Sequence, residues 1–211
     1  MDLPVGVIDY GQGNKGSILN MLKRIGVSAG LVSEPAELRR AGRLILPGVG
    51  SFDSGVRSLR SSGLWDAILD EVLIHRKAFL GICLGMQLLC EGSEEGDDEG
   101  LSLVGGRCKR FTQQSDPCLR VPNMGWNDVR VVTAEGGLFE GADPSHPWRF
   151  YFTHSFYFQS ADPSVVVATA RYGFDYAAAI CRDNVFGVQF HPEKSHRFGM
   201  ALLANFSRIT V

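Results

Sequence analysis

The feature that most restricts the fold of this chain is the alternation of short apolar runs with amphipathic segments before residue 85. Apolar runs that end at turn-forming residues predict strands at residues 4–10, 27–32, 43–46 and 78–80. Helical spacing of apolar residues predicts helices at residues 17–25, 53–61 and 65–76. This alternation indicates an α/β fold with a central, mostly parallel sheet flanked by helices. Reactive groups in such sheets gather at the carboxyl ends of strands, here residues 11–14, 47–50 and Cys83.

The last of these strand ends carries the sequence Gly-Ile-Cys-Leu-Gly at residues 81–85. A cysteine at a strand-to-helix turn, with glycine two residues before and after it, matches the elbow on which other enzymes place a serine nucleophile. We expect a strained turn with little room for a Cβ atom at either glycine. A helix that starts here would favour a thiolate at Cys83, and the Leu84 N–H group would stabilise an oxyanion. The alternative is a buried structural cysteine in a glycine-rich turn.

The second half of the chain has a different character. Residues 91–100 are acidic and rich in glycine, which predicts a solvated, mobile surface loop without a metal site. Strand-like stretches follow, and their turns suggest an antiparallel extension of the sheet. A further buried strand and an amphipathic helix close the chain. These segments are residues 105–112, 129–133, 150–159, 165–170 and 177–180, then the strand 185–190 and the helix 197–209. Because no linker interrupts them, we expect residues 1–211 to form a single domain.

Composition excludes several classes of function. The formal charge of −2 gives no electrostatic footprint for nucleic acid or an anionic membrane. No apolar run approaches the roughly 20 residues that span a bilayer, and no signal peptide is apparent. The cysteines at positions 83, 90, 108, 118 and 181 form neither a C-x-x-C pair nor an even disulfide set. We therefore expect a reducing, cytoplasmic setting, which would keep Cys83 as a thiol.

A cysteine nucleophile needs a base, and two of the five histidines stand at the ends of apolar strands: His154 and His191. The other three, at positions 75, 146 and 196, are expected at the surface. His191 is the sharper candidate because Glu193 follows two residues later in a segment that Pro192 should keep from being helical. A carboxylate beside the imidazole would complete a triad. The alternative is a capping glutamate beside a histidine at a strand end.

Two motifs together resemble the class I, triad-type glutamine amidotransferases. They are Gly-Ile-Cys-Leu-Gly-Met-Gln at residues 81–87 and Gln-Phe-His-Pro-Glu-Lys-Ser at residues 189–195. Four further segments, at residues 9–14, 47–52, 121–127 and 151–156, look like the glutaminase subunits of imidazole glycerol phosphate synthase. The resemblance runs from residue 5 to about residue 206 and implies a flavodoxin-like fold.

The resemblance also implies roles for individual residues. Cys83 would attack the side-chain carboxamide of glutamine, His191 would carry the proton, and Glu193 would orient the imidazole. Backbone N–H groups would stabilise the oxyanion, and other residues would hold the amino-acid part of glutamine. The implied oxyanion-hole residues are Leu84, Val49 and Gly50, and the implied substrate-binding residues are Gln87, Gly48, His154, Ser155 and Phe156. No cofactor or metal is expected.

In such enzymes the ammonia passes to a partner, and the resemblance implies a separate (β/α)8-barrel cyclase subunit. The positions that match its interface are Asn14, Met124, Trp126, Asn127 and Lys194. For Asn14 and Lys194, ordinary turn chemistry is the alternative, whereas tryptophan is enriched in interface hot spots. We expect no nucleic-acid or membrane partner.

Several departures from the family pattern keep a close paralogue open. Lys15, Gly16, Asn123 and the glycine pair at 105–106 stand where the family more often has other residues. The chain would then act either in histidine biosynthesis or as a paralogue that supplies ammonia for an aminated or amidinated surface-polysaccharide sugar. Two hypotheses from other classes of function remain: a peptidase or chaperone-like relative on a similar α/β scaffold, and an inactive binding subunit that regulates a partner enzyme. A cysteine peptidase or chaperone-like relative would not require Gln87, and a catalytically inactive binding subunit would not require the intact Cys83, His191 and Glu193.

Overall fold

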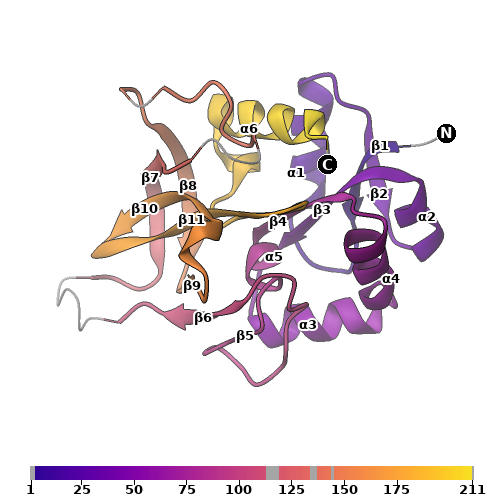
Figure 1. Ribbon diagram of the computed structural model, residues 1–211, viewed down its shortest axis with the longest axis horizontal. Helices are drawn as coiled ribbons and strands as arrows, with labels where there is room; N and C mark the ends of the chain where they lie inside the picture. Colours follow the sequence, from indigo (N-terminus) through magenta and orange to yellow (C-terminus); the bar gives the residue numbers. More distant parts are fainter. Residues whose placement is uncertain (1–2, 113–118, 134–136, 144, 211) are drawn as a thin grey trace.

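The computed structural model describes residues 3–112, 119–133, 137–143 and 145–210. Its centre is a nine-stranded sheet, which Figure 1 shows extending across the molecule. In spatial order the strands are β2 (Ala29–Val32), β1 (Leu3–Ile8), β3 (Ala41–Gly48), β4 (Ala78–Cys83), β12 (Val185–Val188), β11 (Phe174–Arg182), β10 (Val166–Tyr172), β7 (Asn123–Val131) and β8 (Trp148–His154). Cys118 lies outside the described residues.

The sheet is parallel in one half and antiparallel in the other. All pairings from β2 to β12 are parallel, and all pairings from β12 to β8 are antiparallel. The predicted α/β class with an antiparallel extension is therefore confirmed, although that extension makes up a full half of the sheet. Gly48 stands opposite Cys83 in the register of β3 and β4. The carboxyl ends of these two parallel strands therefore meet at the same edge.

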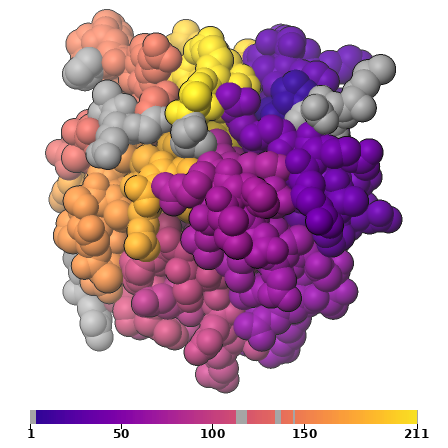
Figure 2. All heavy atoms as spheres, turned by 45° about the vertical axis from the view of Figure 1, so that its right-hand side comes forward, coloured from indigo at the N-terminus to yellow at the C-terminus, as the bar shows by residue number. Residues whose placement is uncertain are grey.

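Helices cover both faces of the parallel half, so its inner strands are buried on both sides, whereas the edge strand β2 stays partly exposed. On one face lie α1 (Lys15–Arg24) and α6 (His196–Arg208), which Figures 1 and 2 show side by side. On the other lie α2 (Pro35–Arg40), α3 (Phe52–Ser61), α4 (Trp65–Leu69) with the π-helical segment η1 (Asp70–Ile74), and α5 (Leu84–Gln87). Successive residues of one strand serve different layers: Ile45 packs under α1 and α6, and Leu44 and Leu46 pack under the opposite helices. Within the described part of the chain, no helix has the length and apolarity to cross a membrane.

The acidic segment 91–100 is not the free surface loop that its composition predicts. Its first residues form β5 (Gly92–Ser93), which pairs with β6 (Gly106–Arg110) and through it with β9 (Phe156–Ser160) in a second, three-stranded sheet. The Asp53 carboxylate of α3 then accepts hydrogen bonds from the N–H groups of Asp97 (3.3 Å) and Asp98 (3.1 Å). Tertiary hydrogen bonds therefore fix a segment whose charge alone suggested full solvation.

Other elements differ from the sequence expectation in length. The strand predicted at residues 150–159 is two strands, because the chain leaves the large sheet at Ser155 and joins the small one. The β7 strand begins at Asn123, six residues before the predicted start at 129. Its first residues alternate in burial, but the inward-facing ones are polar or glycine, so the sequence shows no apolar alternation there. The short helix α2 was not predicted; its start is capped by Glu37, which accepts the Ser33 N–H group at 2.7 Å.

Candidate active site

Cys83 occupies the tight turn between β4 and α5. Its φ of 54° and ψ of −110° lie outside the regions that residues with a side chain normally adopt. A Cβ atom on Gly85 would lie 1.9 Å from the carbonyl oxygen of Leu46, and one on Gly81 would lie 2.5 Å from the oxygen of Gly85. Both flanking positions thus require glycine, as predicted. The α5 helix has only four residues, so its dipole gives a thiolate at Cys83 little support.

His191 is held rigidly at the start of a short 3-10 helix, η3 (Pro192–Lys194). Its backbone N–H donates to the carbonyl of Tyr151 at 2.9 Å, and its own carbonyl accepts from the Ser195 hydroxyl at 2.6 Å. Its Nδ1 atom lies 2.8 Å from Oε1 of Glu193, and the two side chains are only 1% and 2% exposed. The expectation of a non-helical segment was wrong, because proline fits the first position of a helix. The contact between histidine and carboxylate forms nonetheless.

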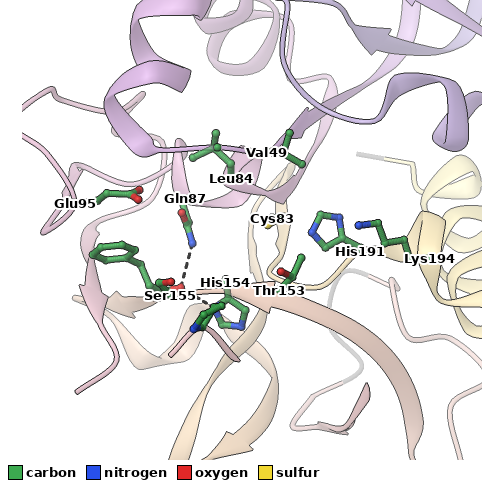
Figure 3. A pocket seen from close by; sticks show the side chains of 13 residues that line it. Val49, Cys83, Leu84, Gln87, Glu95, Thr153, His154, Ser155, His191 and Lys194 are labelled. Carbon is green, nitrogen blue, oxygen red and sulfur yellow. Dashed lines mark hydrogen bonds between the residues drawn. The ribbon is translucent and has the colours of Figure 1, made fainter. Parts of the chain in front are cut away.

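The environment of His191 favours its protonated form. Burial alone would lower the pKa of the imidazole, but the neighbouring Cys83 and Glu193 outweigh burial and raise the pKa to about 10. The Nε2 atom is buried and forms no hydrogen bond of standard geometry with any described residue. It nevertheless lies near enough to Cys83 for the sulfur to raise the pKa of the ring. Figure 3 shows the ring beside the thiol. The site therefore places a protonated imidazole beside the Cys83 sulfur.

Cys83 and His191 open into a cavity of about 330 Å³, a volume suited to a small molecule. Figure 3 shows its side chains converging from both sides of the sulfur. The cavity is lined by Val49, Gly50, Cys83, Leu84, Gln87, Glu95, Pro122, Thr153, His154, Ser155, Phe156, His191 and Lys194. The structure thus brings together the sequence candidates for nucleophile, base, oxyanion hole and substrate binding, with Gly48 as the exception. Among the described residues, no group of three or more His, Cys, Asp or Glu side chains is placed to hold a metal ion.

Gly48 does not line the cavity, so the geometry does not support its predicted contact with substrate. A Cβ atom at this position would lie 2.7 Å from the Gly85 backbone nitrogen and 2.9 Å from the Tyr10 hydroxyl. Tyr10 also donates a hydrogen bond to the carbonyl of Pro47 at 2.8 Å. The residues that follow are less constrained: Val49 is 42% exposed, and Gly50 has a φ of +104° that favours glycine. The strand end is therefore packed on both its neighbours, whereas the residues after it are less enclosed.

One lining residue, Glu95, was missed because it belongs to the acidic segment. Its carboxylate accepts the backbone N–H of Phe52 at 2.8 Å, and this contact holds the acidic segment against the start of α3. Figure 3 shows Glu95 at the end of the cavity beyond Gln87, far from Lys194. Composition could not single out Glu95 among the neighbouring carboxylates, since its position depends on a contact 43 residues away along the chain.

His154 lines the wall of the cavity and carries a neutral ring. Burial, with a smaller contribution from the charge of His191, outweighs the hydrogen bond to Phe156 and lowers the pKa of the imidazole to about 4. Nδ1 donates to the carbonyl of Phe156 at 2.7 Å, and Nε2 faces the Asn123 amide nitrogen at 3.2 Å. A carbonyl can only accept, so the proton resides on Nδ1 and Asn123 donates to Nε2. The departure from the family pattern at Asn123 therefore supplies a donor to this histidine.

Four of the predicted interface residues lie outside the cavity. Asn14 is exposed, and Asn127 is half-buried and donates a hydrogen bond to Asn123. Met124 and Trp126 lie on β7 and are 63% and 39% exposed. Trp126 stacks on His196 with ring centroids 5.5 Å apart. Lys194, the fifth, lines the cavity and places its Nζ atom 5.5 Å from the ring of Tyr151. The Tyr151 ring also lies 6.2 Å from that of Trp126, so Tyr151 connects the exposed tryptophan to Lys194 at the cavity.

The sequence matches the family Glutamine amidotransferase class-I over residues 6–209. The fold agrees with solved structures: "Crystal structure of glutamine amidotransferase" matches with a TM-score of 0.73 at 24% identity over 96% of both chains. The structure of PurLQS from Thermotoga maritima matches with a TM-score of 0.76 at 19% identity over 98% of both chains. This chain therefore belongs to the class I glutamine amidotransferases.

Curated relatives define the branch of that family. Imidazole glycerol phosphate synthase subunit HisH 2 of Pseudomonas aeruginosa is 47% identical, with 95% of this chain and 96% of the relative covered. Subunit HisH of Bdellovibrio bacteriovorus is 43% identical, with 97% and 100% covered. Subunit HisH 2 of Methanococcus maripaludis is 42% identical, with 96% and 98% covered. Within the class I family, the chain groups with the HisH subunits.

Proposed function

We propose that this chain hydrolyses glutamine to glutamate and ammonia, as the amidotransferase subunit of an imidazole glycerol phosphate synthase in histidine biosynthesis. The observation that carries the proposal is that Cys83 and His191 line one small cavity and Glu193 contacts His191, in a chain similar to HisH over almost its full length. We further propose that residues 1–211 act as one domain and that the enzyme works in the cytoplasm.

The reaction begins when the Cys83 sulfur attacks the side-chain carboxamide carbon of glutamine. A C–S bond forms, and the carbonyl oxygen becomes an oxyanion that the N–H of Leu84 and an N–H of the Val49–Gly50 segment stabilise. His191 then donates its Nε2 proton to the amide nitrogen. The C–N bond breaks, ammonia leaves, and a glutamyl thioester remains on Cys83.

Water completes the cycle by attacking the thioester carbon. His191, now neutral, accepts a proton from this water, and the C–S bond breaks to give glutamate and the free sulfur. Glu193 keeps Nδ1 protonated through the 2.8 Å contact, so that Nε2 faces the reacting atoms in both halves. Glu95 supplies the carboxylate of the cavity lining, and we propose that it binds the α-ammonium group of glutamine.

Ammonia released into solution would diffuse away before it reacts, so we propose that the chain delivers it to a cyclase partner with a (β/α)8-barrel fold. The surface proposed for this partner consists of Met124, Trp126 and Lys194, with Asn14 and Asn127 at its edge. Its large exposed apolar side chains favour a protein partner. Reorientation of the peptides after Gly48 on complex formation would complete the oxyanion hole, which would couple glutaminase activity to the partner.

A second candidate function concerns the product of the partner. The departures from the family pattern, among them Lys15 and Asn123, keep a close paralogue open, and two of the relatives, from P. aeruginosa and M. maripaludis, carry the numeral 2 in their names. The chain would in that case supply ammonia for an aminated or amidinated surface-polysaccharide sugar. Glutamine chemistry is the same in both cases, and only assays with the two kinds of partner separate them.

The deciding experiment compares two ammonia sources in the complex with the cyclase partner. Cys83→Ala should abolish glutamine-dependent synthesis and leave synthesis from added ammonium salts largely intact. A diazo-ketone analogue of glutamine should label the wild-type chain at Cys83, and glutamine should protect it. Equal loss of both activities, or labelling that glutamine does not prevent, contradicts the proposed function. Either result would favour a structural cysteine or a peptidase-like site.

A further inference from the structure

Gln189 lies directly behind the nucleophile and has no place in the reaction as described above. It follows β12, and its backbone N–H donates to the carbonyl of Ala178 at 2.9 Å. The side chain is completely buried and does not line the cavity, so it does not touch substrate there. Its amide lies between two residues of the site: Oε1 is 3.1 Å from Nε2 of Gln87, and Nε2 is 3.8 Å from Sγ of Cys83.

The hydrogen-bond network fixes which end of the Gln189 amide faces the sulfur. Gln87 contacts the carbonyl oxygen of Phe156 at 3.1 Å, and a carbonyl oxygen can only accept. The Gln87 group at this contact is therefore its NH₂, which also faces Gln189. Two NH₂ groups cannot pair, so Gln189 turns its oxygen to Gln87 and its own NH₂ to Cys83. A glutamine flipped the other way would bring a partly negative oxygen to the sulfur.

We propose that Gln189 is a positioning residue that holds the Cys83 sulfur as a thiolate facing His191 through an N–H···S hydrogen bond. The inference rests on the proposed function, in which the thiolate is the attacking species. A donor at a buried sulfur stabilises the charged form, and more strongly than it would in water because the surroundings are poorly solvated. Gln87 anchors the donor by occupying the other end of the amide.

Gln189 is uncharged, so its N–H donor is present at every pH at which the protein is folded. The titratable groups that face the sulfur or its cavity are His191 after β12, Tyr10 after β1, and His154, Glu95 and Lys194 in the cavity wall, of which His154 is neutral. Of these, His191 supplies the positive charge, and burial raises the pKa of Tyr10, which stays neutral. The amide therefore adds a donor that does not itself titrate.

The test is the pH dependence of Cys83 alkylation by iodoacetamide in the full chain, followed by peptide mapping. This readout needs neither glutamine nor a partner. Gln189→Met keeps the length of the side chain and removes the donor, so the pH midpoint of alkylation should rise by about one unit, equivalent to a rate about tenfold lower at a pH below the midpoint. Gln189→Glu keeps the acceptor for Gln87 but brings a carboxylate to the thiolate, so its midpoint should rise at least as far.

A matched control separates positioning from general stability. Asn184 is another buried amide, which donates to the carbonyls of Val72 and Lys77 at 2.8 Å each, beside Phe79 at the opposite end of β4 from Cys83. Asn184→Leu should lower Tm and leave the alkylation midpoint at the wild-type value. A wild-type midpoint in either Gln189 variant, whatever its Tm, overturns the inference. Normal alkylation without labelling by the diazo-ketone would instead contradict the proposed function alone.

Discussion

The Nδ1 atom of His191 lies 2.8 Å from Oε1 of Glu193 in a site where both side chains are almost fully buried, and Oε2 of the same carboxylate has no hydrogen-bond partner among the described residues. A buried carboxylate with one unsatisfied oxygen is costly, and this cost is offset if the neighbouring ring is charged. The buried contact between His191 and Glu193 is therefore best explained by the positive charge that the carboxylate stabilises on the ring.

Removal of this charge should slow the reaction without unfolding the protein. Glu193→Gln keeps the size of the side chain but takes away the negative charge that raises the pKa of His191. We expect kcat/KM for glutamine in the complex to fall by about 10- to 1,000-fold. The ammonia-dependent activity of the same complex serves as the control and should not change. A variant with wild-type glutamine turnover would show that the carboxylate has no role in orienting the ring.

The buried His154 should make the protein sensitive to mild acid. The unfolded chain binds a proton at this ring near pH 6.5, whereas the folded protein does so only near pH 4. Stability is therefore present above pH 6.5 and is lost as the pH falls toward 4, by about 2 kcal/mol between pH 7 and pH 5. His191 acts in the opposite direction in this window: its raised pKa keeps the folded ring protonated, whereas the unfolded ring still takes up protons near pH 6.5, so His191 offsets part of the loss between pH 7 and pH 5.

Urea unfolding at pH 7 and pH 5 measures this effect. His154→Asn retains an N–H group toward Phe156 and removes the titration, so its loss of stability between the two pH values should be smaller than that of the wild type. The exposed His146 provides the comparison, and His146→Asn should keep the wild-type difference. If His154→Asn and wild type lose the same free energy, the ring is not held neutral by burial.

The reactive half of the site could be predicted from the sequence because it depends on local geometry. The two glycines around Cys83 report a turn with no space for a Cβ atom, and His191 and Glu193 are close in the chain as well as in space. The parallel half of the fold was predictable for a similar reason, since its strands are continuous apolar runs.

The rest of the site depends on contacts between distant segments. Glu95 reaches the cavity through the backbone of Phe52, and Gln189 meets the sulfur only because β4 and β12 are neighbours in the sheet. Gly48 illustrates the reverse case, since its motif was recognised but its packing against Gly85 keeps it out of the cavity. Motifs identify the residue types, whereas strand pairing decides which side chains face the substrate.

The tight turn at the nucleophile should be intolerant of a single methyl group. Gly85→Ala would place a Cβ atom 1.9 Å from the Leu46 oxygen, which belongs to the backbone of a central strand and cannot move aside cheaply. We expect a loss of about 3 kcal/mol or more in the free energy of unfolding. Gly16 in α1 has open space at the same atom, and Gly16→Ala should be neutral or stabilising by up to about 1 kcal/mol. Similar stability of the two variants in chemical denaturation would contradict the geometry of the elbow.

The exposed face of β7 should carry the affinity for the proposed partner. Trp126 is 39% exposed and stacks on His196 at the surface, so Trp126→Ala removes a large contact area while leaving the core intact. The dissociation constant for the cyclase should rise about 10- to 100-fold, in the range of a hot-spot residue, with Tm of the isolated chain nearly unchanged. Val132 is also apolar and 58% exposed but lies just beyond the end of β7, and Val132→Ala should bind like the wild type. Calorimetric titration of the partner distinguishes the two variants. Equal affinities would show that Trp126 does not belong to the docking surface.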